Sequence, residues 1–213
     1  MSFKVEFKNY LDELYKSLCE VSDWMYENPE LGFQEFKTSK HLVDYIQKNS
    51  KSVNYPSHGL ETAFDVTFGE DGPLVVICVE YDALPEIGHA CGHNIIATAS
   101  IGAGLGLKDI ASKLGIRVKL LGTPAEEGGG GKIILINEGA FEDASCSMMI
   151  HPGYEDVVNP TFTTIQQYTV EYFGKDAHAA GAPDQGINAL DAQIQLFVNA
   201  STYRQQMVQS NRM

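Results

Sequence analysis

Long apolar runs, paired cysteines and clustered basic residues are all scarce in this chain of 213 residues. No apolar run approaches the roughly 18 residues that a membrane helix requires, so we expect no membrane-spanning segment. The N-terminus is mixed and charged, unlike a secretory signal, and we therefore expect a cytoplasmic protein. The 4 cysteines are widely scattered without a Cys-x-x-Cys pair, which excludes a small disulfide-rich fold.

Basic residues number only 15 against 28 acidic ones, which gives a formal net charge of −13. Because phosphate groups are bound by clustered Lys and Arg, a nucleic-acid partner is disfavoured. The acidic balance would suit a cationic small substrate, but solubility explains it equally well. The remaining composition, 44% hydrophobic and 20% charged, is ordinary for a globular protein.

Helical and extended patterns alternate through the first 159 residues. Apolar residues at three-and-four spacing predict helices at 8–28, 35–48, 95–114 and 132–139. Short apolar runs predict extended segments at 53–55, 62–68, 74–79, 117–121 and 145–150. The run 74–79 is typical of a strand buried on both faces, and 145–150 is predicted as a further central strand. This alternation predicts an α/β fold with a mainly parallel sheet covered by helices.

The pattern changes after Pro160. Residues 163–173 alternate in a β-rich pattern, and residues 187–208 are predicted as one long helix. We therefore expect two domains, an α/β domain at 1–159 and the start of a small α+β domain at 160–213. One strand and one helix bury little surface, so the second domain is expected to be unfinished in this chain.

The strongest chemical signal is the segment Gly88–Asn94, which follows the predicted strand 74–79. Cysteine thiolates and neutral histidines are good ligands for zinc-like metals. Cys91 and His93 flank one glycine, so both side chains can turn toward the same ion. Taken alone, a buried thiol beside a surface histidine explains this segment equally well.

Two further strand ends carry ligand-type residues: Glu126 and Glu127 follow 117–121, and His151 follows 145–150. Neighbouring side chains point apart, so one carboxylate could bind a metal while the other faces a reacting water. Taken alone, each feature is more often a surface acidic pair or a structural histidine. Functional groups gather at the carboxyl ends of strands, so together with Cys91 and His93 these residues predict a metal site.

Two glycine patterns imitate nucleotide-binding motifs. Gly102, Gly104 and Gly106 fall inside a predicted helix, where small residues favour close helix–sheet packing instead. The segment Gly128–Lys132 lacks the Ser or Thr of a phosphate loop, and Glu126 and Glu127 would repel phosphate. Neither pattern therefore indicates a nucleotide.

An ordered set of motifs gives the chain a family resemblance. The motifs are Asn28–Gly32, Tyr81–Pro85, Gly88–His93, Gly122–Glu127 and His151-Pro152. Over essentially the whole chain, this set resembles the metallopeptidase family of aminoacylases, dipeptidases and auxin-conjugate amidohydrolases. The resemblance implies a zinc-exopeptidase-like catalytic domain at 1–159, followed at 160–213 by the first strand and helix of a lid domain through which two copies dimerise.

The resemblance also implies roles for individual residues. Cys91, His93, Glu127 and His151 match the metal ligands of the family, Glu126 matches its general base, and His178 matches a lid histidine that stabilises the oxyanion. The implied cofactor is zinc, or manganese or cobalt, with two ions in the complete enzyme. The implied substrates are small dipeptides or N-acyl amino acids, in particular dipeptides with a basic C-terminal residue.

The sequence departs from the family pattern in two respects. Asn94 stands where many relatives carry Asp, and the family places further catalytic sheet and a last metal-ligating histidine after the lid. We therefore expect a truncated chain. The alternative function is a non-catalytic family member that acts as a metal-binding or dimerising module. The retained Cys91, His93, Glu126, Glu127 and His151 favour the enzyme.

Overall fold

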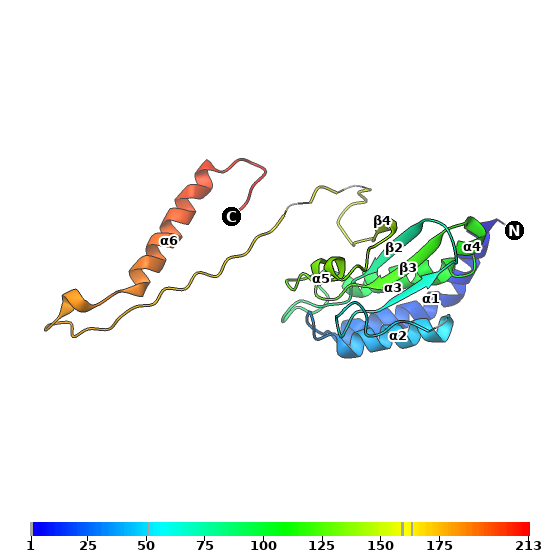
Figure 1. Cartoon of the computed structure of the whole chain (residues 1–213), viewed down its shortest axis with the longest axis horizontal. Coiled ribbons are helices and arrows are strands. Elements are labelled where there is room, and N and C mark those ends of the chain that lie inside the picture. The colour runs from blue at the N-terminus through cyan, green and yellow to red at the C-terminus, as the bar shows by residue number, and fades with distance from the viewer. Residues whose placement is uncertain (1, 51, 159, 163) are drawn as a thin grey trace. The chain divides into compact units, whose positions relative to one another are not determined.

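A computed structural model of the chain describes residues 2–50, 52–158, 160–162 and 164–213. The chain divides into two compact units, Met1–Asp156 and Val157–Met213. Asn159 at the expected domain boundary, and Thr163 at the start of the expected strand, lie outside the described residues. The fold class is mixed α/β, as the sequence predicts (Figure 1).

The first unit is built on a four-stranded sheet with the order β1-β3-β2-β4. The strands are β1 (Asp65–Phe68), β2 (Leu74–Val79), β3 (Arg117–Gly122) and β4 (Ala144–Met148). β2 pairs in parallel with both β3 and β4, whereas β1 is antiparallel to β3. The prediction of a mainly parallel sheet around the buried run 74–79 is confirmed.

Three predictions about extended segments need correction. The segment 145–150 was expected as a central strand, but β4 pairs only with β2 and lies at the edge of the described sheet, where most of its residues are exposed. The predicted segment 62–68 is extended only over β1, and the segment 53–55 contributes a single bridge between Asn54 and Asp65.

The helices of the first unit are α1 (Phe3–Glu27), α2 (Phe36–Asn49), α3 (His93–Leu107), α4 (Ala111–Leu114) and α5 (Gly131–Asn137). The helices expected at 8–28, 35–48 and 132–139 are confirmed with shifted ends. The single helix expected at 95–114 is wrong, because the chain turns between α3 and α4, where it buries Ile110 just before α4 and Ala111 at the first residue of α4. α3 also begins two residues early, directly after Gly92 in a left-handed conformation.

Helices cover both faces of the sheet. The larger core lies between the sheet and α1, α2 and α3, while Leu135 of α5 packs with Val76 and Cys78 on the other face (Figure 1). A Cβ atom at Gly104 would lie 2.5 Å from Leu120, so this glycine lets α3 approach β3 closely. The interpretation as helix–sheet packing residues is thus confirmed for Gly104, whereas Gly102 and Gly106 face Leu18 and Phe7 of α1.

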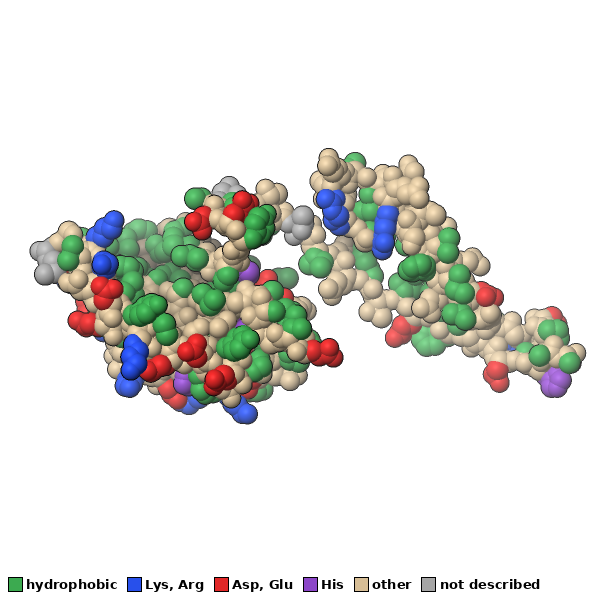
Figure 2. All heavy atoms as spheres, turned by 180° about the vertical axis from the view of Figure 1, so that it is seen from behind, with side chains coloured by type: hydrophobic (Ala, Val, Ile, Leu, Met, Phe, Trp, Pro, Cys, Tyr) green, Lys and Arg blue, Asp and Glu red, His purple; other side chains and the backbone are tan. Residues whose placement is uncertain are grey.

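The second unit has little internal structure. Its elements are α6 (Ala189–Tyr203) and two short 3-10 helices, Pro183–Gln185 and Arg204–Gln206. The strand expected at 163–173 is absent from the described residues, where only Lys175 and Ile187 form a bridge. The helix expected at 187–208 is shorter. None of the described residues of this unit is buried, and Figure 2 shows hydrophobic side chains at its surface. A strand needs a paired neighbour, and the unit supplies none over 164–173.

None of the helices that the structure describes is both long and apolar enough to cross a bilayer.

Candidate metal centre

The carboxyl ends of β2 and β3 lie side by side. Val79 and Gly122 are partners in the parallel register, and the Thr123 N–H donates to the Val79 carbonyl oxygen over 2.8 Å. The loops that follow these strands therefore leave the sheet together. One loop carries Glu80 and Asp82, and the other carries Glu126 and Glu127.

His93 lies between these two loops. Its side chain is 1% exposed, and His93 is the first residue of α3. The Nε2 atom lies 3.5 Å from Oε2 of Glu80 and 3.7 Å from Oε1 of Glu127. The same Nε2 lies 3.9 Å from Oε2 of Glu126. One imidazole nitrogen thus faces three carboxylates.

The atoms that face one another here have no hydrogen-bond partners. Among the described side chains, Nε2 of His93, Oε2 of Glu80 and Oε1 of Glu127 are buried and unpartnered. A buried polar atom without a partner costs about 1–3 kcal/mol, so three at one point call for a shared partner. A cation satisfies all three, and nitrogen with carboxylate oxygen is a donor set suited to zinc, manganese or cobalt. These residues fit a metal ion.

In the part of the chain that the structure describes, two groups of side chains could hold an ion. Glu80, His93 and His151 form one group, and His93, Glu126 and Glu127 form the other; within each group the ligand atoms lie within 4.8 Å of one another. His93 belongs to both groups. The structure therefore brings together His93, Glu126, Glu127 and His151 from the sequence analysis and adds Glu80.

Asp82 orients this arrangement. The Nδ1 atom of His93 donates to Oδ1 of Asp82 over 3.1 Å, and Oδ2 accepts the Glu127 backbone N–H over 2.9 Å. With its proton on Nδ1, His93 presents the Nε2 lone pair to the centre. Burial raises the pKa of Asp82, but these hydrogen bonds outweigh it and hold the pKa below its usual value.

The sequence analysis assigned no role to Glu80 or Asp82. Both lie directly after the strand 74–79, as does the segment with Cys91 and His93, so strand-end position was the signal that could have found them.

His151 is exposed and meets His93 edge to face, with ring centroids 6.1 Å apart. Its Nδ1 donates to the Pro152 carbonyl oxygen over 2.8 Å. This hydrogen bond leaves the lone pair on Nε2, which is the protonation state that a metal ligand requires.

Cys91 is in neither group, but it interacts with one of them. Hydrogen bonding with the Glu127 carboxylate raises the pKa of the Cys91 thiol to about 11, and burial and the charges of Glu127, Glu126 and Asp82 act in the same direction. The thiol is therefore protonated in the ion-free chain.

Comparison with known proteins shows which proteins this chain is similar to. The mouse Xaa-Arg dipeptidase is 39% identical over 211 residues, which is 92% of this chain and 49% of that protein. The human Xaa-Arg dipeptidase is 36% identical over 223 residues, or 96% of this chain and 51% of that protein. The Bacillus subtilis YXEP protein, a dinuclear metal binding peptidase from the M20 family, superposes with a TM-score of 0.58 at 25% identity over 64% of this chain and 42% of that one.

The chain belongs to the M20 peptidase family. No family model matched the chain. The segment Glu80–Asn94 resembles the Xaa-Arg dipeptidase branch of the M20 family, in agreement with the first two relatives. The chain spans about half the length of these curated relatives.

Glu126 differs from its neighbour in its surroundings. Its side chain is 43% exposed, whereas that of Glu127 is 20% exposed. Burial and then the charge of Glu80 raise the pKa of Glu126, against the opposing charge of Lys132. Lys132 itself pairs with Oε1 of Glu80. In this M20 chain the pKa of the more exposed carboxylate, Glu126, is thus moved toward neutrality, which suits a general base.

His178 lies in the second unit. Its Nδ1 accepts the Ala180 N–H over 3.3 Å and the Gly181 N–H over 2.9 Å. The two units are described separately, so the role of His178 at the oxyanion stays a prediction.

Metal affinity in this M20 chain is expected to rise with pH. Burial opposes the charged form of His93, but the hydrogen bond and charge of Asp82, with the charges of Glu80 and Glu127, raise its pKa on balance. Below that pKa, an ion held by both His93 and the predicted ligand Cys91 would displace one proton from each. Above it, only the Cys91 proton remains, up to a pKa of about 11. Each released proton changes the affinity about tenfold per pH unit. Zinc titrations against a competing chelator between about pH 6 and pH 8 check this, and an affinity independent of pH would contradict it.

Proposed function

We propose that the protein is a metal-dependent hydrolase that cleaves an amide or peptide bond in a small dipeptide or N-acyl amino acid. The observation that carries this proposal is the convergence of three buried, unpartnered atoms of Glu80, His93 and Glu127, with the Glu126 carboxylate beside them. The relatives named Xaa-Arg dipeptidase support dipeptides with a basic C-terminal residue as substrates.

The proposed roles follow from the chemistry of each group. Cys91, His93, Glu127 and His151 would hold the metal, which when bound polarises the scissile carbonyl and lowers the pKa of a coordinated water. Glu126 takes a proton from the attacking water and returns it to the leaving amine. His178 stabilises the developing oxyanion, an effect typically worth ~2.7–4 kcal/mol.

Four further features belong to this proposal. Zinc is the proposed ion because a thiolate and two imidazoles favour it, and two ions are proposed because His93 belongs to two donor groups. The unit Val157–Met213 is proposed as the start of a lid through which two copies form a homodimer, and its uncovered apolar side chains support this. A cytoplasmic location is proposed, supported by four free cysteines.

Substrate choice is tested with the full-length protein and a panel of dipeptides. We expect dipeptides ending in Lys, ornithine or Arg to show a higher kcat/KM than N-acyl neutral amino acids, by at least about tenfold, or about 1.4 kcal/mol in the transition state. Equal rates for the two classes would remove the dipeptidase assignment while leaving the hydrolase assignment intact.

A further inference from the structure

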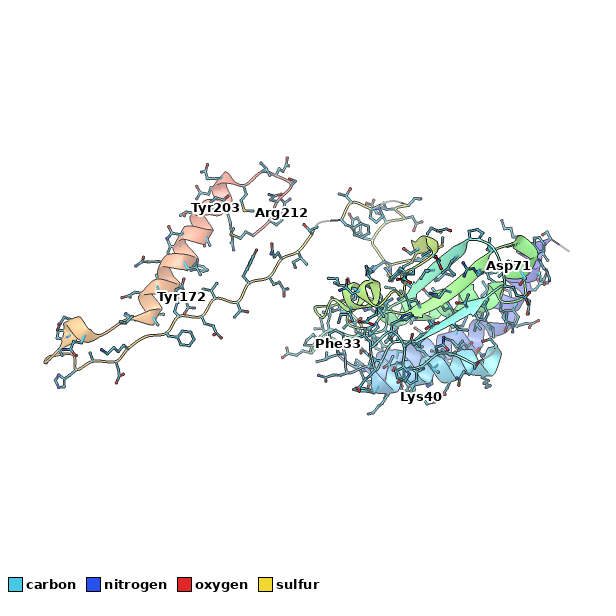
Figure 3. The ribbon with its side chains drawn as sticks, in the orientation of Figure 1. Phe33, Lys40, Asp71, Tyr172, Tyr203 and Arg212 are labelled. Carbon is cyan, nitrogen blue, oxygen red and sulfur yellow. The ribbon has the colours of Figure 1, made fainter. Side chains whose placement is uncertain are left out.

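The segment Asn28–Glu35 carries a family motif that the metal centre does not use directly. It lies between α1 and α2, and Phe33, labelled in Figure 3, is part of it. The Glu30 carbonyl oxygen accepts the Ala83 N–H over 2.8 Å, and Leu31 forms a bridge with Ala83. The segment therefore holds the loop that follows β2.

The last residue of the segment, Glu35, reaches the other loop. Its carboxylate is fully buried; Oε1 accepts the Ala125 N–H over 2.8 Å and Oε2 accepts the Thr62 hydroxyl over 3.0 Å. The Thr62 carbonyl oxygen in turn accepts the Tyr81 hydroxyl over 2.6 Å. A continuous chain of hydrogen bonds thus joins Tyr81, after β2, to Ala125, after β3.

Ala125 is a position that needs such support. Its φ is +56°, a left-handed conformation that costs an ordinary residue free energy, and its side chain is fully buried. A Cβ atom at Gly32 would lie 3.0 Å from the Ala125 Cα, so the segment also packs directly against this residue. The next two residues are Glu126 and Glu127. The backbone at Ala125 therefore sets where both carboxylates point.

Burying the Glu35 carboxylate costs more free energy than burying a neutral hydrogen-bond acceptor would. Among the described residues no Lys, Arg or His lies within ion-pair distance of its carboxylate, and burial raises its pKa despite the hydrogen bonds. Burying a carboxylate without a cation costs free energy, and hydrogen bonds from two fixed donors, one to each oxygen, offset that cost.

We propose that Glu35 is a positioning residue of the metal centre: through the Ala125 N–H it fixes the strained turn that aims Glu126 and Glu127 at His93. The role of Glu35 in the metal centre rests on the proposed function. The hold of Glu35 on the 123–127 loop is a property of the ion-free chain.

The test combines two measurements on the 213-residue chain. Amide hydrogen exchange of peptides covering 123–129 reports the loop without any metal, and titration with Co²⁺ reports the centre. We expect Glu35→Ala to speed exchange in this loop at least about tenfold and to weaken Co²⁺ binding about 10- to 100-fold, the usual effect of losing a residue that orients a ligand.

Three variants make the result specific. Glu35→Gln keeps an oxygen that accepts the Ala125 N–H, so it should restore exchange and Co²⁺ affinity to within about threefold of wild type. Glu30→Gln is the matched control, because among the described residues the Glu30 carboxylate accepts only the backbone N–H groups of Lys37 and Thr38 at the start of α2. It should change neither reading more than about twofold. If Glu35→Ala does not fold, Thr62→Val, which removes one donor to Glu35, should speed loop exchange in the same direction.

The outcomes separate the two proposals. Exchange at 123–129 that is unchanged in Glu35→Ala, or changed equally in Glu30→Gln, overturns the positioning role. A wild-type chain that binds no Co²⁺ while Glu35→Ala still loosens the loop counts against the proposed function and leaves the hold of Glu35 on the loop established.

Discussion

Glu126→Gln in the full-length protein should lower kcat by about 10²- to 10⁴-fold, the usual contribution of a general base. The amide keeps the shape of the side chain but cannot take the proton of the attacking water. Oε2 of Glu126 lies 3.9 Å from Nε2 of His93, and Glu126 is the more exposed of the adjacent carboxylates, so the fold should be unchanged. Gln keeps a side-chain oxygen, and the group of Glu80, His93 and His151 is untouched, so the chain should still bind metal. Steady-state kinetics with a dipeptide ending in Lys or Arg provides the measurement.

The control for Glu126→Gln is a carboxylate of the same unit that has no part in the metal centre. Glu61 is exposed, and Glu61→Gln should retain wild-type kinetics. Hydrolysis that persists undiminished in Glu126→Gln, with wild-type metal content, would sink the mechanism and favour the alternative of a metal-binding or dimerising module.

The second large effect is expected from His93→Ala. This side chain is the one that both candidate groups share, and its Nε2 faces Glu80, Glu126 and Glu127. Its removal leaves three carboxylates without the nitrogen that holds a cation among them. We expect metal affinity to fall by more than the roughly 100-fold that loss of a merely orienting residue costs, with hydrolysis lost in parallel.

Metal content by elemental analysis, with circular dichroism to confirm the fold, measures this effect. His41→Ala is the control, since His41 stacks on Trp24 at 4.1 Å and belongs to neither donor group. Retention of a stoichiometric ion by His93→Ala would mean that the centre is organised around other residues.

The sequence predicted the frame of the site well where local pattern decides structure. The segment 74–79 is a continuous apolar run, typical of a strand buried on both faces, and β2 matches it. The short segment 117–121, in which Arg117 and Lys119 alternate with apolar residues, matches β3 closely. Because parallel strands end at one edge, the position of Glu126, Glu127 and His93 near one another followed from chain order alone.

The finer geometry depended on contacts that no local pattern records. Asp82 orients His93 through a side-chain hydrogen bond, and Glu35 holds Ala125 across 90 positions of sequence. The alternation at 163–173 predicted a strand, but a strand forms only against a paired neighbour, and the described residues of this unit pair only at Lys175 and Ile187, beyond that segment. Tertiary partners, not local preference, decided these features.

The proposed function requires this chain to hold metal ions at His93, and the decisive measurement is the metal content of the 213-residue protein. The protein would be purified without chelator, dialysed against zinc and then against metal-free buffer, and analysed for zinc per chain. We expect between one and two tightly held ions per chain, because two donor groups share His93. No stoichiometric ion after dialysis against zinc, manganese or cobalt in turn would contradict it.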